Sequence, residues 1–396
     1  MNSIKFITIC SLLAAVAGGC DTDQLSSIET DTSAPGPIKN VEAEPLAGAA
    51  RLTYSLPSDP DLLYVQAIYK NKAGRDMEFK SSYYTNTLVV DGFPDTEAHT
   101  VDLYAVDRSG NRSTPVTIQV TPKTPPVLAT FHTLAVEPDF GGATISFINA
   151  TKADLAIIVT TPDSTGTMAV TRTFYTARDT ASFSVRGFES VSRQFGVFVR
   201  DRWGNESDVL LQELIPIYEI ELDKTKFREI SLPGDAACTS WGGAMPYVWD
   251  GRITGDVSGF GLHTGNASTG IPKIITFDLG VEAQLSRFAL QTVQDDRHWY
   301  NDVSPKRYEV WGALNYNPDG SLDGWTKLLS ITNIKPSGLP IGLFTDDDRT
   351  AGRIGDEADV PSEMPRVRYI RVRCLENWSG NTNMVFSEVT FWGSDK

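Results

Sequence analysis

The chain has 396 residues, a formal net charge of −15, and 41% hydrophobic against 21% charged residues. Its length exceeds that of one ordinary β-domain, so two or three domains are expected. The acidic balance argues against binding of nucleic acid or another polyanion over the whole surface, but it sets no limit on a neutral ligand. The 32 glycines and 22 prolines favour many turns over long helices.

Residues 1–20 have the features of a lipoprotein signal peptide. Lys5 supplies a positive charge, Phe6 to Val16 is apolar, and Ala17-Gly18-Gly19-Cys20 ends the segment. This ending resembles a bacterial lipobox, which implies that Cys20 is lipidated; the alternative is an ordinary signal with an incidental cysteine. Residues 21–37 are rich in Asp, Ser and Thr and predict a flexible tether. No later run reaches the roughly 18 apolar residues of a transmembrane helix.

The next part of the chain contains a duplication, with an offset of about 94 residues. Val106 to Ser113 matches Arg200 to Ser207, and both segments carry the pattern Asp-Arg-x-Gly-Asn-x-Ser. Val90 to Phe93 likewise matches Val185 to Phe188. We interpret the repeated octad as a structural turn, because Gly and Asn suit backbone positions with positive φ and no ligand is needed to explain it.

Both copies alternate short strands with turn residues, which predicts β-sandwiches of immunoglobulin type. The strands expected in the first copy are Arg51–Leu56, Tyr64–Asn71, Thr87–Val90, Thr100–Asp107 and Val116–Val120. The copies resemble fibronectin type III modules, in which a Tyr/Phe-x-Val-x-Ala/Val-x-Asp strand precedes a Gly-Asn turn, as Leu103 to Asn111 does here. We assign them to residues 38–122 and 127–216. Pro122 to Pro126 is a predicted stiff linker, and Ile215 to Leu232 is a second connector.

Four motifs in the last part of the chain occur in the order of a known family. They are the Asp250-Gly251 turn, the strand Ile274 to Gly280 that ends Asp-Leu-Gly, the strand Ser304 to Gly312, and the terminal Phe386 to Gly393. Together they resemble the coagulation-factor 5/8 type C (discoidin) domain, a jelly-roll β-sandwich whose bacterial members include family 32 carbohydrate-binding modules. The resemblance covers residues 235–396. The expected fold is therefore all-β, with two immunoglobulin/fibronectin type III-like sandwiches followed by a discoidin-like jelly roll.

The resemblance implies a structural Ca²⁺ ion that joins the first loop of this domain to the end of the chain. Asp250 and Glu388 are the side-chain ligands that carry over, and backbone oxygens of the loop through Thr254 and Asp256 complete an oxygen-only set that suits a hard cation. The alternative is an Asp-capped turn and an exposed glutamate at the start of the last strand.

The resemblance also implies a sugar site on the loops at one end of the sandwich. His263, Arg297, Asn301 and Trp378 match the family's His/Arg/Asn/aromatic arrangement in order, and Trp299 lies in the same polar loop. Arg and Asn can bond sugar hydroxyls, while an indole stacks on the C–H face of a pyranose.

Each of these residues also has an ordinary structural interpretation. Trp299 and Tyr300 would then anchor their loop in the sandwich, and Arg297 would pair only with a neighbouring aspartate. Trp241 and Trp249 are expected in the core, as indoles near strand ends usually are.

Two cysteines remain after the signal segment, which holds Cys10 and Cys20. Cys238 and Cys374 are a candidate disulfide in an oxidising compartment, and the alternative is two buried free thiols. No Cys-x-x-Cys or His cluster suggests zinc.

The chain lacks a Gly-x-Ser-x-Gly elbow, a His-Glu-x-x-His helix and a phosphate loop, so we expect no enzyme activity. The pattern resembles multi-domain lipoproteins of polysaccharide-utilisation systems in Bacteroidetes. This resemblance implies a glycan-binding protein of the outer membrane, with its lipid as the only membrane contact and the cell surface as its location. The periplasmic face is the other possibility, and no nucleic acid partner is expected. The alternative function is an adaptor or adhesin that docks onto an outer-membrane transporter or enzyme.

Overall fold

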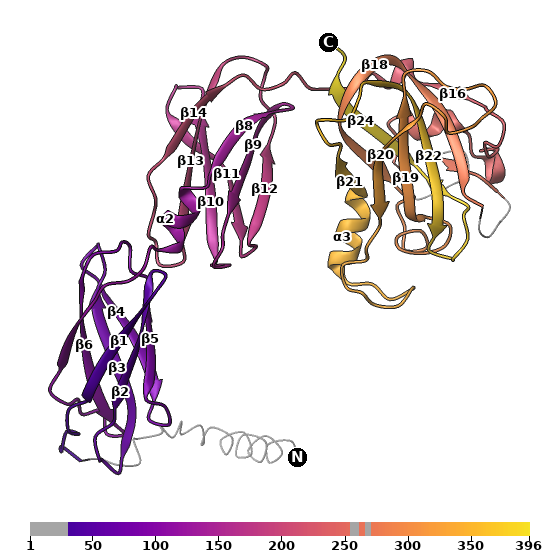
Figure 1. Ribbon diagram of the computed structural model, residues 1–396. Helices are drawn as coiled ribbons and strands as arrows, with labels where there is room; N and C mark the ends of the chain where they lie inside the picture. Colours follow the sequence, from indigo (N-terminus) through magenta and orange to yellow (C-terminus); the bar gives the residue numbers. More distant parts are fainter. Residues whose placement is uncertain (1–30, 254–260, 266–270) are drawn as a thin grey trace, which may run out of the picture.

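The computed structural model describes residues 31–253, 261–265 and 271–396. These residues are almost entirely strands and turns, and they form three sandwich units in succession along the chain (Figure 1). Each unit has its own hydrophobic core. The predicted all-β fold class is thereby confirmed. Among the described residues, none of the helices has the length and apolar character needed to cross a membrane.

The first module consists of two antiparallel sheets, in the strand orders β1-β2-β5 and β4-β3-β6-β7. Its strands are β1 (Lys39–Leu46), β2 (Ala49–Ser55), β3 (Leu62–Lys70), β4 (Asp76–Ser82), β5 (Thr87–Asp91), β6 (His99–Asp107) and β7 (Val116–Val120). Five of them overlap predicted strands. The other two, β1 and β4, are edge strands in which exposed charged residues alternate with only a few apolar ones, so the pattern is weak.

The second module repeats this topology. Its sheets have the orders β12-β9-β8 and β11-β10-β13-β14, so each strand has a counterpart in the first module. The elements are α2 (Pro126–Phe131), β8 (Ala135–Asp139), β9 (Gly142–Ile148), β10 (Leu155–Pro162), β11 (Met168–Thr176), β12 (Thr180–Val185), β13 (Arg193–Asp201) and β14 (Leu210–Leu214). The predicted proline linker leads directly into α2, which has proline at its first position.

The third domain is built around one long strand, β18 (Lys273–Gln291). Its first half pairs with β16 and β22 and its second half with β21 and β24, with an irregularity between Asp278 and Ala283. The remaining elements are β15 (Ile220–Glu221), η1 (Lys224–Lys226), β16 (Arg228–Ile230), η2 (Ser240–Gly242), η3 (Met245–Trp249), β17 (Leu262–His263), β19 (Pro305–Ala313), β20 (Thr326–Thr332), α3 (Asp346–Ile354), β21 (Asp356–Asp359), β22 (Val367–Asn377), β23 (Val385–Phe386) and β24 (Glu388–Ser394).

The repeated octad turn of the second module contacts the first module. Arg202 forms an ion pair with Asp91 over 3.0 Å, and the Asn205 side chain donates to the carbonyl of Gly92 over 3.0 Å. Trp203 lies so close that a Cβ added at Gly92 would be 2.7 Å from its Cγ. The turn is structural, as predicted, and it also forms the junction between the modules.

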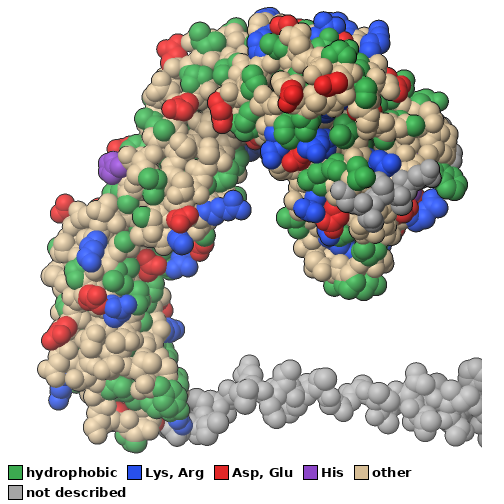
Figure 2. Space-filling model, turned by 45° about the vertical axis from the view of Figure 1, so that its right-hand side comes forward, with side chains coloured by type: hydrophobic (Ala, Val, Ile, Leu, Met, Phe, Trp, Pro, Cys, Tyr) green, Lys and Arg blue, Asp and Glu red, His purple; other side chains and the backbone are tan. Residues whose placement is uncertain are grey.

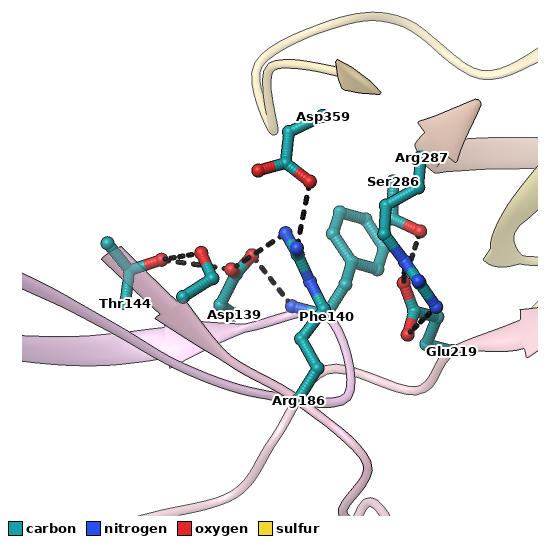
Figure 3. Close-up of polar contacts among 9 residues, drawn as sticks. Asp139, Phe140, Thr144, Arg186, Glu219, Ser286, Arg287 and Asp359 are labelled. Carbon is teal, nitrogen blue, oxygen red and sulfur yellow. Dashed lines mark hydrogen bonds and ion pairs between the residues drawn. The ribbon is translucent and has the colours of Figure 1, made fainter. Parts of the chain in front are cut away.

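Polar contacts join the second module to the third domain (Figure 3). Arg186 lies between Asp139, at 3.2 Å, and Asp359 of the third domain, at 2.8 Å. The carboxylate of Glu219 accepts hydrogen bonds from Ser286 and Arg287. Arg186 thus links the second module to the third domain, and Glu219 fixes the connector to the third domain.

Candidate functional site

One end of the third domain gathers four segments that are distant in sequence. His263 of β17 pairs with Val385 of β23 and forms a bridge with Thr239, next to η2. The amide of Val385 in turn donates to the carbonyl of Val303, in the polar loop 294–304. The amide of Trp378 donates to Ser304 at the end of the same loop. The backbone thus brings the segments of the predicted sugar residues to one end of the sandwich.

His263 is half-buried in this end. The Gly265 amide donates to its Nδ1 atom over 3.0 Å, so a neutral ring carries its proton on Nε2 and can donate there. Burial lowers the pKa of His263 below its ordinary value, although the nearby Asp302 carboxylate acts in the opposite direction. A neutral imidazole is therefore expected at neutral pH, which suits a hydrogen bond to an uncharged hydroxyl.

The loop 294–304 presents Arg297 to solvent. The Arg297 side chain is 80% exposed and pairs with Asp295 over 3.1 Å, as its structural interpretation predicted. Asn301 is half-buried, and its Oδ1 atom accepts from the Asp302 amide over 2.8 Å. Its two neighbours in the chain, Tyr300 and Asp302, have φ values of 49° and 48°, a left-handed conformation that is costly for side chains other than glycine. Such strain is often found where function requires a particular loop shape.

Trp378 is half-buried within the network of this loop. Its Nε1 atom donates to Asn333 over 3.0 Å, and its ring meets that of Tyr300 edge to face at 5.6 Å. The Lys306 ammonium lies 5.1 Å from the ring centroid. These contacts orient the indole, and they leave it less open than a stacking platform would be.

Trp299 does not reach the surface, which corrects its expected role as a sugar contact. It is 6% exposed and packs against α3, where a Cβ added at Gly352 would lie 2.6 Å from its Cγ. Arg353 covers the ring at 5.4 Å. The alternative interpretation, an anchor for the loop, matches this position.

Trp241 was expected in the core, and this expectation is wrong. It is 72% exposed, it has a φ of 54°, and its ring centroid lies 6.4 Å from that of His263. The residues that follow it, Gly242 and Gly243, mark a turn rather than a strand, and this signal could have identified an exposed indole. Trp249 is buried against Phe277 at 5.5 Å, as predicted for it.

The expected calcium ligands have other partners in the structure. Glu388 is buried, and its carboxylate accepts from the Lys224 ammonium at 2.5 Å and from the Gly251 amide at 3.2 Å. Asp250 is held by Arg252. Burial raises the pKa of Glu388, and Lys224 opposes this shift.

A cation at this place would have to displace an ammonium group, so the described residues do not fit Ca²⁺ as arranged. The loop residues Thr254 and Asp256 lie outside the described part of the chain. The calcium ion stays a prediction that thermal melting with and without EDTA tests: the arrangement of Lys224 predicts unchanged curves, and a lower melting temperature in EDTA would restore the ion.

The expected disulfide is absent, since Cys238 and Cys374 are both free. Each is buried in the third core, and each thiol points to a carbonyl oxygen, of Ala236 at 3.4 Å and of Asn383 at 3.6 Å. Burial raises the pKa of both thiols to about 12, so they are unreactive at neutral pH. The candidate lipidation site, Cys20, lies outside the described residues.

Three domain families match the chain, and all three are described as domains of unknown function. DUF4959 matches residues 35–122, DUF5126 matches residues 123–225, and DUF5000 matches residues 249–393. No curated protein matches the chain.

Several solved structures resemble parts of the chain. A family 32 carbohydrate-binding module of a family 31 glycoside hydrolase, bound to N-acetylgalactosamine, has 15% identity over 42% of this chain and 95% of that chain, with a TM-score of 0.29. The C-terminal domain of a chitobiase from Bacteroides fragilis has 16% identity over 44% and 98%, with a TM-score of 0.29. At these values, neither bears on a ligand of this chain.

A stronger match is the SusE-like protein BT2857, with 59% sequence identity and a TM-score of 0.43. The match covers 44% of this chain and 100% of that chain. Because identity this high extends over the whole of that protein, the chain belongs to the same family as this SusE-like protein.

Proposed function

We propose that the chain is a non-catalytic glycan-binding lipoprotein of the cell envelope, which captures carbohydrate through the loop end of its third domain. One observation carries this proposal: the exposed Trp241 indole lies next to the neutral, donor-bearing His263. An aromatic face beside a polar donor is the basic requirement for holding a sugar ring. The family relation to a SusE-like protein supports the envelope setting.

In this proposal each residue contributes one type of contact. The Trp241 ring covers the C–H face of a pyranose, and the Nε2–H group of His263 donates to a hydroxyl. Arg297 and Asn301 border the same end of the domain and supply further hydrogen bonds. The strained conformations of Tyr300 and Asp302 hold this loop in shape before the ligand arrives, which reduces the entropy cost of binding.

Binding by one ring and a few hydrogen bonds is weak, on the order of micromolar to millimolar. A lipid at Cys20 would place many copies on one surface, and repeated weak contacts with a polymer would then add up to stable capture. The outer membrane, the cell surface and the absence of catalysis remain parts of this proposal.

Affinity electrophoresis of the mature chain in gels that contain plant or host polysaccharides tests the proposal. We expect retardation by at least one neutral polysaccharide, and we expect Trp241→Ala to reduce it strongly. Tyr84→Ala is the matched control, because Tyr84 is an equally exposed aromatic residue, at 81%, in the first module. Equal retardation of Trp241→Ala and the unmodified chain would refute the site.

An adaptor function is the second candidate, and exposed apolar side chains favour it. Ile334, Leu343 and Ile354 are all more than half exposed on α3 and the loop before it. Surfaces that bind another protein expose apolar side chains of this kind. Co-purification with an outer-membrane protein that Leu343→Ser abolishes, together with no retardation in any polysaccharide gel, would favour the adaptor.

A further inference from the structure

We propose a second saccharide site, on the outer sheet face of the second module, that takes an uncharged sugar ring of a glycan. Its place is a hollow across strands β11, β10 and β13, at the end of the sheet next to the first module. It is separate from the loop end of the third domain and does not depend on it.

The register of the three strands produces the hollow. Ala156 of β10 pairs with Tyr175 of β11 on one side and with Arg200 of β13 on the other. Residues that pair directly share one face of a sheet, so these three side chains form a row. Leu155 and Ile157 belong to the core, which places Ala156 on the outer face.

A methyl group thus lies between two long side chains. Ala156 is only 6% exposed although it faces outward, because Tyr175 and Arg200 project past it. The resulting cavity has a volume of about 450 Å³. This is within the range of small-molecule sites. It is lined by Asp154, Leu155, Ala156, Tyr175, Thr176, Ala177, Arg200, Asp201 and Arg202.

The first module shows that the scaffold alone does not make this hollow. Tyr64 takes the central position there, between Ser82 and Val106. Val106 occupies the same place before the repeated turn as Arg200 does in the second module. The row therefore has one large side chain between two smaller ones in the first module, and one small side chain between two large ones in the second.

The chemistry of the lining selects for a sugar ring. Tyr175 is 77% exposed, so its ring offers an open apolar face. Arg200 has only a loose ion pair with Glu206, at 3.7 Å, and keeps N–H groups for a ligand. The Asp154 carboxylate is exposed and can accept hydrogen bonds from a ligand. An aromatic wall with donors and acceptors around it suits a ring with one C–H face and several hydroxyl groups.

The charges of the lining favour an uncharged ligand. Two guanidinium groups, of Arg200 and Arg202, face two carboxylates, of Asp154 and Asp201, so the cavity has no net charge. Asp201 is already engaged by the amides of its own turn, and Arg202 is held by Asp91 of the first module. The guanidinium groups of Arg200 and Arg202 already have carboxylate partners, Glu206 and Asp91, and an acidic sugar would have to compete with these two.

Saturation-transfer NMR on the mature chain tests the proposal. All variants carry Trp241→Ala, so that the proposed site of the third domain is silent. The probes are maltohexaose, cellohexaose and mannohexaose, with a galacturonate hexamer as the acidic comparison. We expect at least one neutral hexamer to receive saturation, and Tyr175→Ala to reduce its affinity at least tenfold.

Ala156→Leu is the more specific variant, because it fills the hollow and leaves every polar group in place. It should reduce binding as much as Tyr175→Ala does, whereas Tyr84→Ala, the control in the first module, should leave it unchanged. If Ala156→Leu lowers the melting temperature of the chain, Tyr175→Ala decides alone, since an exposed tyrosine contributes little to folding.

Three results would overturn the proposal. These are no transfer to any neutral hexamer in the Trp241→Ala chain, transfer that Tyr175→Ala leaves intact, and transfer to the acidic hexamer alone. Each is distinguishable from failure of the third-domain site, because that site is judged by the effect of Trp241→Ala in the unmodified chain.

Discussion

The two modules share one topology but use it differently. Their octad turns have the same internal hydrogen bonds: Asp107 and Asp201 each accept from the asparagine four residues later, Asn111 or Asn205. In the second module this turn contacts the preceding module, and in the first it contacts residues 31–33 of the preceding segment. Both copies of the turn therefore contact the segment that precedes their own module. Single residues of the turn decide how strong this contact is.

Trp203 is the clearest of these single residues. Its counterpart in the first module is Ser109. The indole packs against Gly92 and lies 5.6 Å from the ring of Phe79, so it joins the two modules where a serine would not. The charged side chains do not distinguish the modules in the same way. Figure 2 shows acidic and basic side chains mixed along the visible face of both modules.

The largest expected difference between the modules comes from their cores. Phe195 in β13 is fully buried, and the matching residue of β6 is Val101. We expect Phe195→Ala to destabilise the second module by about 3–5 kcal/mol, because it leaves a large cavity. Val101→Ala should destabilise the first module by roughly 2 kcal/mol. Hydrogen exchange of the β10 and β3 amides measures both, and equal loss of protection in both modules after either substitution would show that they unfold as one.

The junction should respond next. Trp203→Ser introduces the residue that the first module has at this position and removes the indole from Gly92 and Phe79. We expect it to weaken the contact between the two modules by about 1–3 kcal/mol. Spin labels on the two modules, read by pulsed electron resonance, should then give a broader distance distribution. Tyr84→Ala serves as control, and an unchanged distribution in Trp203→Ser would mean that other contacts hold the junction.

A smaller effect is expected from the asparagine of the turn. Asn205→Ala loses hydrogen bonds to Asp201 and to the Gly92 carbonyl. We expect it to lower the stability of the turn and of its contact with the first module by about 1–1.5 kcal/mol. Asn111→Ala should lower the stability of the first module without broadening the spin-label distances. If Asn205→Ala and Asn111→Ala broaden the spin-label distances equally, then Asn205 has no special role in holding the two modules together.

The exposed ion pair of the junction should matter least. Asp91→Asn removes one charge from the pair with Arg202 but keeps an oxygen that accepts from the Gly92 amide. We expect a change of less than about 1 kcal/mol, which disappears in high salt. Chemical denaturation at low and high salt measures it, and a salt-independent loss would assign the effect to packing instead.

Much of the fold was predictable from local patterns. Five strands of the first module, the duplication and the turn residues follow from alternation and from Gly and Asn at bends. Strands β1 and β4 escaped because few apolar residues mark their inner faces and most of their side chains are exposed. At the candidate site, the segments of His263, Arg297, Asn301 and Trp378 do meet at one end of the domain.

The tryptophans were the weakest part of the prediction. Trp299 lies within a polar loop and is buried, whereas Trp241 was expected in the core and is exposed. Whether an indole faces solvent depends on what packs over it, and for Trp299 this is α3, about fifty residues further along the chain.

The amino-acid sequence by itself determined the succession of β-sandwiches, the repeat of one module and the shape of its turns, because strand alternation and backbone conformation depend on neighbouring residues. The tertiary structure alone decided that Lys224 pairs with Glu388, that the two cysteines are free buried thiols, and that Ala156 lies in a hollow between Tyr175 and Arg200. Each of these features depends on residues that are far apart in the sequence and come together only when the domains fold.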